Sequence, residues 1–249
     1  MDGTALKRAF ADTSLPLSQR LGAGKTLLRQ EDGEAFVASR YRSADRGTVR
    51  ALLDSLRRDD VVRAARLAAA LLVVAPGEEK LDFQALLVSL GRPAVPPLVE
   101  TVERDQDWQT VLQAMGALGK LKAPEGVDVM AARLTHPNTW VRMGAAHALG
   151  EVGAARVVPA LIRALEDTAD TVVSAALVGL GRSGDARAVT PCSAHLAHAN
   201  PRVRAAAASA LGRLGRKESV PLLKHMRDDP DSGVRYKAEQ ALRAIEGER

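Results

Sequence analysis

The stretch VRAAAASALG (203–212), followed by VPLL (220–223), decides the fold of this chain because its pattern recurs every 31 residues. The recurring positions are Val141, Val172, Val203 and Val234; Leu149, Leu180, Leu211 and Leu242; Gly150, Gly181 and Gly212; and Gly153, Gly184 and Gly215. A fixed period in this range indicates a stacked array of small supersecondary units.

One repeat predicts a pair of helices. Asn138 is a suitable N-cap for a first helix, whose apolar side chains from Val141 to Leu149 follow helical spacing. Gly153 ends this helix, and a second one begins near Ala155. A pair this small cannot bury its own apolar face, so it must stack on neighbouring pairs.

The same reading extends over most of the chain. Further helices are expected at 16–30, 31–41, 45–58, 60–74, 79–90, 93–104, 107–121 and 125–134, with a lone last helix from Asp231. The fold class is therefore all-α, a right-handed α-solenoid of about seven stacked helix pairs plus a terminal helix. We divide it into an N-terminal region of degenerate repeats (1–78) and a regular array (79–249).

The motif resembles the HEAT family, specifically the short bacterial phycobilisome-lyase HEAT-like repeats. The resemblance covers 107–246 and extends more loosely to 79–106 and upstream. It implies that the second helix of each pair lines a concave binding surface. It also implies that Arg142, Arg204 and Arg235 bridge turns to a nearby aspartate, with Val173 interrupting this ladder.

Composition and charge exclude several classes of protein. The net charge is +5 but unevenly spread: 13 Lys/Arg against 9 Asp/Glu over 1–66, 6 against 9 over 67–136, and 16 against 12 over 137–249. This gives no continuous basic stripe for nucleic acid. The longest apolar run, 67–75, is short of the ~20 residues that span a membrane. We expect no signal peptide, no membrane insertion and a cytoplasmic location.

No set of residues indicates catalysis, so we expect no enzyme activity, no cofactor and no metal. Deoxyhypusine hydroxylase, a HEAT-repeat enzyme, holds iron with His-Glu pairs, whereas no histidine here is followed by glutamate. The segment GAGKT (22–26) lacks the first glycine and the preceding strand of a phosphate-binding loop. Cys192 occupies the column of Leu161, which favours a buried apolar role over a reactive thiol.

The candidate binding residues lie on the predicted concave face. They are Arg133, Arg163, His195, Lys224, His225 and Arg227. Together they would form a mildly basic strip for an acidic protein segment or a phosphate-bearing partner, unless they are simply a solvated face. Trp108 and Trp140 could form one patch at the repeat edge for a partner, or fill gaps between repeats.

The first functional hypothesis is therefore a non-catalytic scaffold that binds another protein along its concave surface. One alternative is an enzyme subunit resembling bilin lyases, which the short repeats suggest. Another is a nucleic-acid binding protein like the HEAT-like DNA glycosylases, against which the acidic middle of the chain argues.

Overall fold

The computed structural model describes residues 2–30, 32–42 and 45–247. Throughout these ranges the only regular elements are helices and short 3-10 turns. The chain forms two compact units, Met1–Ala117 and Leu118–Arg249, and helix α8 (Trp108–Lys120) contains the division between them. The predicted all-α class is confirmed.

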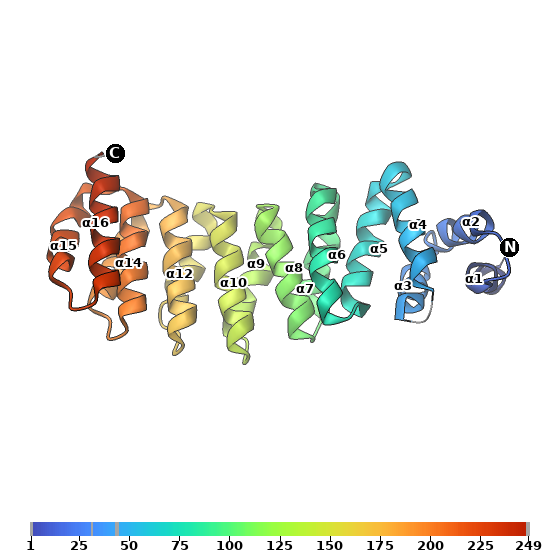
Figure 1. Ribbon diagram of the computed structural model, residues 1–249, viewed down its shortest axis with the longest axis horizontal. Helices are drawn as coiled ribbons and strands as arrows, with labels where there is room; N and C mark the ends of the chain where they lie inside the picture. Colours follow the sequence, from blue (N-terminus) through green and yellow to red (C-terminus); the bar gives the residue numbers. More distant parts are fainter. Residues whose placement is uncertain (1, 31, 43–44, 248–249) are drawn as a thin grey trace. The chain divides into compact units, whose positions relative to one another are not determined.

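The first unit contains the less regular helices (Figure 1). They are α1 (Gly3–Ala11), α2 (Leu17–Leu27), α3 (Gly33–Arg42), α4 (Arg46–Asp59), α5 (Val61–Val74), α6 (Gly77–Leu90) and α7 (Val95–Arg104). Helix α1 was not predicted from the repeat. Asp2 caps it by accepting the Ala5 N–H at 2.7 Å, and Leu6 and Phe10 are buried. The glycine-rich segment 22–26 lies inside α2 and is therefore helical.

The second unit repeats with high regularity. After the end of α8 come α9 (Val127–Ala132), α10 (Thr139–Val152), α11 (Val158–Ala164), α12 (Asp170–Ser183), α13 (Val189–Ala194), α14 (Pro201–Leu214), α15 (Val220–His225) and α16 (Ser232–Glu246). Along the described chain, α2 to α15 thus form the seven predicted pairs, and α16 is the predicted lone last helix.

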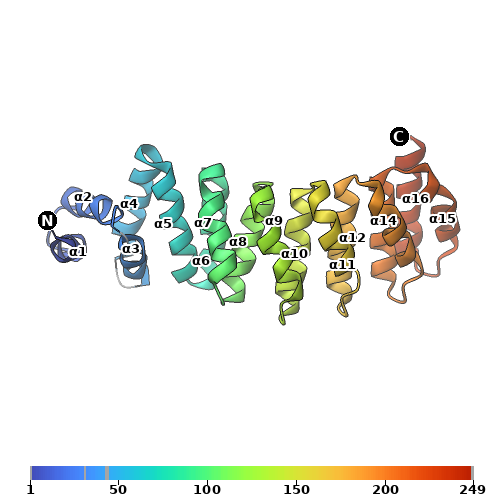
Figure 2. The same cartoon turned by 180° about the vertical axis from the view of Figure 1, so that it is seen from behind.

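The first helices of this unit lie side by side, and the view from behind shows α11 against α12 (Figures 1 and 2). The repeated valines and leucines form its core: Val141, Val172, Val203 and Val234 are fully buried, as are Leu149, Leu180 and Leu211.

A close approach of backbones sets the register between first helices. A Cβ added at Gly150 would lie only 2.6 Å from the Cα of Gly179 on the next first helix. A methyl group does not fit there, which explains why the repeat carries glycine in this column. The later column of Gly153 instead provides a left-handed residue that ends each first helix, with φ of 66° at Gly153.

Candidate protein-binding surfaces

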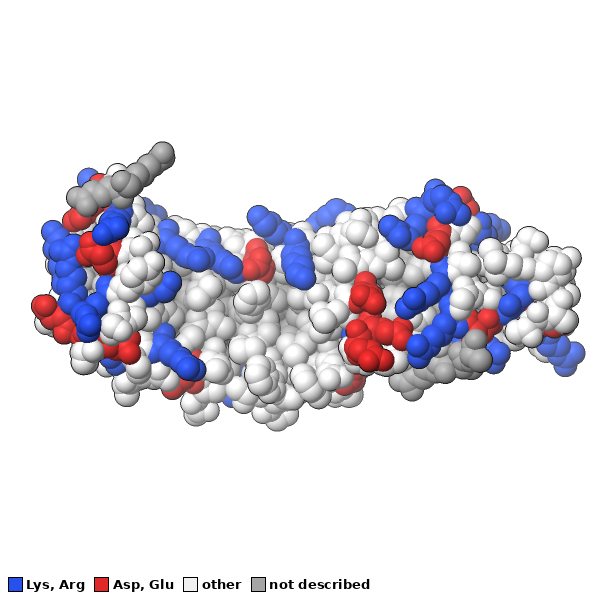
Figure 3. Space-filling view, viewed as in Figure 1, with Lys and Arg blue, Asp and Glu red and all other residues white. Residues whose placement is uncertain are grey.

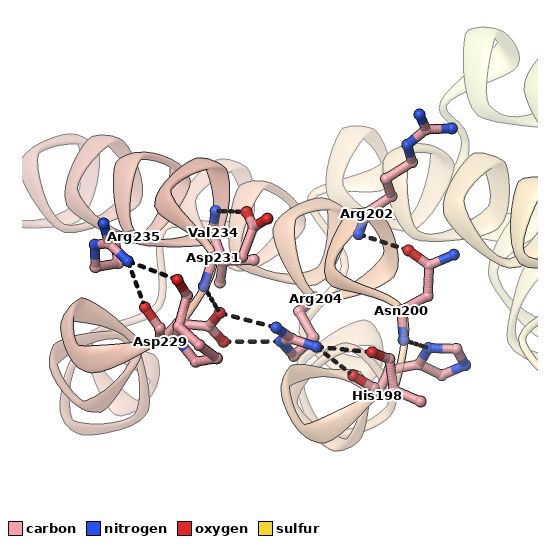
Figure 4. Close-up of polar contacts among 10 residues, drawn as sticks. His198, Asn200, Arg202, Arg204, Asp229, Asp231, Val234 and Arg235 are labelled. Atoms are coloured by element: carbon pink, nitrogen blue, oxygen red, sulfur yellow. Dashed lines mark hydrogen bonds and ion pairs between the residues drawn. The ribbon is translucent and has the colours of Figure 1, made fainter.

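The repeated arginines form the predicted ladder (Figure 4). Arg204 donates Nε and Nη2 to the two carboxylate oxygens of Asp229, both at 2.8 Å. Its Nη1 also donates to the carbonyls of His198 and Ala199, at 2.9 and 3.0 Å. Hydrogen bonding to Arg204 lowers the pKa of Asp229. This side chain thereby connects the turn before α14 with the turn after α15, at the two ends of one repeat.

Arg142 makes the same contacts one double repeat earlier. It donates Nε and Nη2 to Asp167, at 2.7 and 3.0 Å, and Nη1 to the carbonyl of His136 at 3.0 Å. The hydrogen bond from Arg142 lowers the pKa of Asp167. Arg235 at the last step keeps only the carbonyl contacts, 2.8 Å to Asp229 and 3.0 Å to Pro230. The predicted bridge to an aspartate side chain is confirmed for Arg142 and Arg204, whereas Arg235 contacts backbone carbonyls in its place.

At one position of the 31-residue repeat, aspartate and histidine alternate from one repeat to the next. The residues are Asp105, His136, Asp167, His198 and Asp229, and each accepts the backbone N–H of the residue two positions later, at 2.7 to 3.1 Å. For the last four of these residues, the residue 25 positions earlier changes with the aspartate or histidine. It is arginine before an aspartate (Arg142 before Asp167, Arg204 before Asp229) and valine before a histidine (Val111 before His136, Val173 before His198). Thus the interruption at Val173 is matched by loss of the aspartate that it would have paired with.

The predicted basic strip is only partly available for a partner. His195 is half-buried, with Nδ1 2.9 Å from the Pro191 carbonyl and Nε2 3.4 Å from the Leu165 carbonyl. Lys224 and Arg227 are exposed but pair with α16, at 3.4 Å to Glu246 and 2.8 Å to Glu239.

Three further residues complete the strip. Arg163 on α11 and His225 on α15 are exposed, while Arg133 is half-buried and has contacts of its own. The role of this strip therefore remains a prediction.

Trp108 and Trp140 are both exposed, by 40% and 60%. These values are too high for residues that fill a gap between repeats. The exposed state agrees with a partner contact, although a common patch of the two side chains stays a prediction.

A groove not anticipated from sequence runs over the second helices of the first unit. It has a volume of about 810 Å³ and is lined by α3, α5 and α7. Its apolar lining residues are Ala35, Ala69, Ala70, Val73, Pro96 and Pro97. Charged residues border it: Arg66 pairs with Glu34 at 2.8 Å and Arg104 with Glu100 at 2.5 Å, and Asp105 adds a carboxylate. The only sequence signal for it was the small apolar residues on successive second helices.

Reactive groups give little indication of chemistry. Burial raises the pKa of the Cys192 thiol to about 12, so the expectation of a buried apolar role is confirmed. In 2–30, 32–42 and 45–247, no three His, Cys, Asp or Glu side chains gather where a metal ion could be held. None of the helices in these ranges combines the length and apolarity that crossing a membrane requires.

The HEAT-repeat family model matches residues 95–181 and 172–243, more than half of the chain. The chain belongs to the HEAT-repeat family. A comparison with the curated proteins found no match to it.

Solved structures show similar architectures. The CpcE–CpcF complex of phycocyanin lyase from Nostoc sp. is 26% identical, covers 73% of this chain and 76% of its own, and has a TM-score of 0.55. A designed armadillo repeat protein in complex with the peptide (KR)4 is 15% identical over 84% of this chain and 98% of its own, with a TM-score of 0.54. Human deoxyhypusine hydroxylase is 20% identical over 99% of this chain and 96% of its own, with a TM-score of only 0.39. The phycocyanin lyase complex and the armadillo repeat protein establish a repeat solenoid fold.

Proposed function

We propose that this HEAT-repeat protein is a non-catalytic scaffold that binds another protein along the face formed by its second helices. The groove over α3, α5 and α7 carries this proposal. It is a concave surface that three consecutive repeats build together, as expected for a binding face of a repeat array.

The lining of the groove suits a polypeptide segment better than a flat cofactor. Its floor is made of alanine, valine and proline side chains, and none of the lining residues is aromatic. The guanidinium groups at its edge are already paired with Glu34 and Glu100, so the groove lacks the surplus positive charge that a phosphate would need. Burial of partner side chains on the apolar floor would supply the affinity.

The basic strip of the second unit remains part of this proposal. Arg163 and His225 are exposed on the second helices α11 and α15, where they would meet an acidic segment of the partner. Exposed charges of this kind mainly increase association rates and select partners.

The test is affinity capture from the native cell extract with two pairs of variants. Val73→Glu places a charge on the groove floor, and Val62→Glu places one on the same helix outside the lining residues. We expect Val73→Glu to lose a protein that the wild type and Val62→Glu retain. The double variant Arg163→Glu, Lys224→Glu tests the basic strip in the same way. Retention of the same proteins by every variant would contradict the proposal.

A second candidate is a lyase-like subunit that acts on open-chain tetrapyrroles. It is favoured by the 26% identity to the phycocyanin lyase complex over 73% of the chain. Mixing the protein with several bilins and recording the visible spectrum tests it. A new absorption band would support this function, and unchanged bilin spectra would remove its basis.

A further inference from the structure

The outer face of the first helices α10, α12 and α14 is almost free of charge at its centre. Figure 3 shows this region as a broad white area over α10 and α12, with charged side chains along its edges. The residues that form it lie in rows 31 positions apart, one on each helix. From the N-terminal to the C-terminal end of the helices, the rows are Trp140, Thr171, Arg202; Met143, Ser174, Ala205; Gly144, Ala175, Ala206; His147, Val178, Ser209; and Glu151, Arg182, Arg213. All fifteen residues are exposed or half-exposed.

The register of these rows is fixed by contacts. The ion pair between Glu151 and Arg182 joins two members of the last row. The close approach of Gly150 to Gly179, 29 positions apart, holds α10 and α12 in direct contact beside this ion pair. Residues in one row are therefore lateral neighbours across the face.

The rows are self-complementary about the middle helix. A two-fold axis parallel to α12 brings α10 of one copy opposite α14 of the other. In the first row this sets Trp140 against Arg202, and in the last row Glu151 against Arg213. In the second row the large Met143 meets the small Ala205. The α10 edge of one copy thus faces the α14 edge of the other with complementary groups. Trp140 can form a cation–π contact with Arg202, and Glu151 can form an ion pair with Arg213.

Both end groups are available for such contacts. Trp140 is 60% exposed, and Figure 4 shows the Arg202 side chain pointing away from the Arg204–Asp229 network. Arg182 would lie near the axis, where Glu151 of its own chain already balances its charge.

We propose that a second copy of this chain binds to this face, forming a two-fold symmetric dimer. The three helices have 14 residues each, about 21 Å in length, and neighbours pack ~8–10 Å apart. The face is then about 600 Å² per copy, or ~1,200 Å² in total, at the lower limit of specific interfaces. We expect a dissociation constant in the micromolar range, and the groove of the first unit is not used.

Sedimentation of the full chain over a range of concentrations tests the dimer. The wild type is expected to shift from one chain of 26.4 kDa towards twice that mass as concentration rises. Trp140→Arg sets two arginines against each other and should weaken the dimer at least tenfold. The double variant Trp140→Arg, Arg202→Trp exchanges the two groups and should restore it, since only facing residues can be swapped.

Further variants keep the test decisive. Arg213→Glu opposes Glu151 with a like charge and should also weaken the dimer, whereas Arg163→Glu, on the second helix α11, should leave it unchanged. Unchanged helicity would show that each variant folds. A wild type that stays monomeric at every concentration, a Trp140→Arg variant that dimerises normally, or an exchanged variant that stays monomeric would each overturn the two-fold arrangement.

Discussion

Arg204 holds Asp229 with two parallel hydrogen bonds of 2.8 Å each, and so connects the first helix of one repeat to the turn 25 residues later that leads into the next repeat. The aspartate is buried and the arginine nearly so, with 5% and 13% of their side chains exposed. A paired geometry of this kind is more specific than a single ion pair, because both groups are planar and must be coplanar to bond. The ladder therefore fixes how one repeat follows the next.

The alternation of Arg–Asp with Val–His predicts a coupling that a double variant can measure. Val173→Arg alone buries a guanidinium opposite His198 and should destabilise by about 2 kcal/mol. In the wild type, Asp170 lies 3.7 Å from the His198 imidazole. His198→Asp alone would therefore place two carboxylates near each other and should also lower the stability of the fold. The double variant places an Arg–Asp pair at these two positions, equivalent to the pair of Arg142 and Asp167. We therefore expect a favourable coupling free energy of about 1–3 kcal/mol between the two substitutions. Urea unfolding of the four proteins measures it, and additive effects would refute the alternation as a paired feature.

How far the sequence predicted the fold depended on whether a residue belonged to the repeat. The buried columns around Val141 and Leu149 were predictable because identical spacing requires identical packing. Helix α1 was missed because it lies before the first repeat, although Asp2, Leu6 and Phe10 are a capping residue and two apolar residues at helical spacing.

The candidate site was harder to predict because it depends on contacts between elements. Arg227 looked available on its own helix, but Glu239 on α16 pairs with it at 2.8 Å. His195 likewise contacts the Leu165 carbonyl of the preceding repeat. The groove over α5 lies among repeats whose sequence pattern has diverged, so no column of residues marked it.

Lys122 is predicted to be a site of local strain. It occupies the column of Gly153 and, with φ of 49°, is the only left-handed residue other than glycine in the described chain. This conformation costs a side-chain-bearing residue about 1 kcal/mol, partly offset by the greater freedom of glycine in the unfolded chain. Lys122→Gly should therefore stabilise by about 0.5 kcal/mol. In thermal unfolding, the matched variant Gly153→Lys should move the midpoint in the opposite direction, and a loss of stability in Lys122→Gly would contradict the strain.

Cys192 is predicted to be inert in the folded protein. Its side chain is fully buried and the pKa of its thiol is raised to about 12, so almost no thiolate exists near neutral pH. A thiol reagent such as DTNB should react only as fast as the second unit opens. An exposed Ser232→Cys control should react at once. Equal rates at both positions in folded protein would show that Cys192 is accessible.

Acid should weaken the second unit through its ladder aspartates. Hydrogen bonds from Arg142 and Arg204 lower the pKa of Asp167 and of Asp229 below that of an unfolded aspartate, about 3.9. Because the folded-state pKa is the lower one, each pair contributes its stability above pH ~4 and loses it as the pH falls through the folded pKa. Asp229→Asn should cost about 2 kcal/mol near neutral pH and less below pH ~4, since the wild-type carboxyl is then protonated as well. Asp54→Asn, at an exposed position, should change little at any pH. Urea unfolding from pH 7 to pH 3 measures this, and a difference between Asp229→Asn and wild type that stays constant across the range would exclude the ladder as its source.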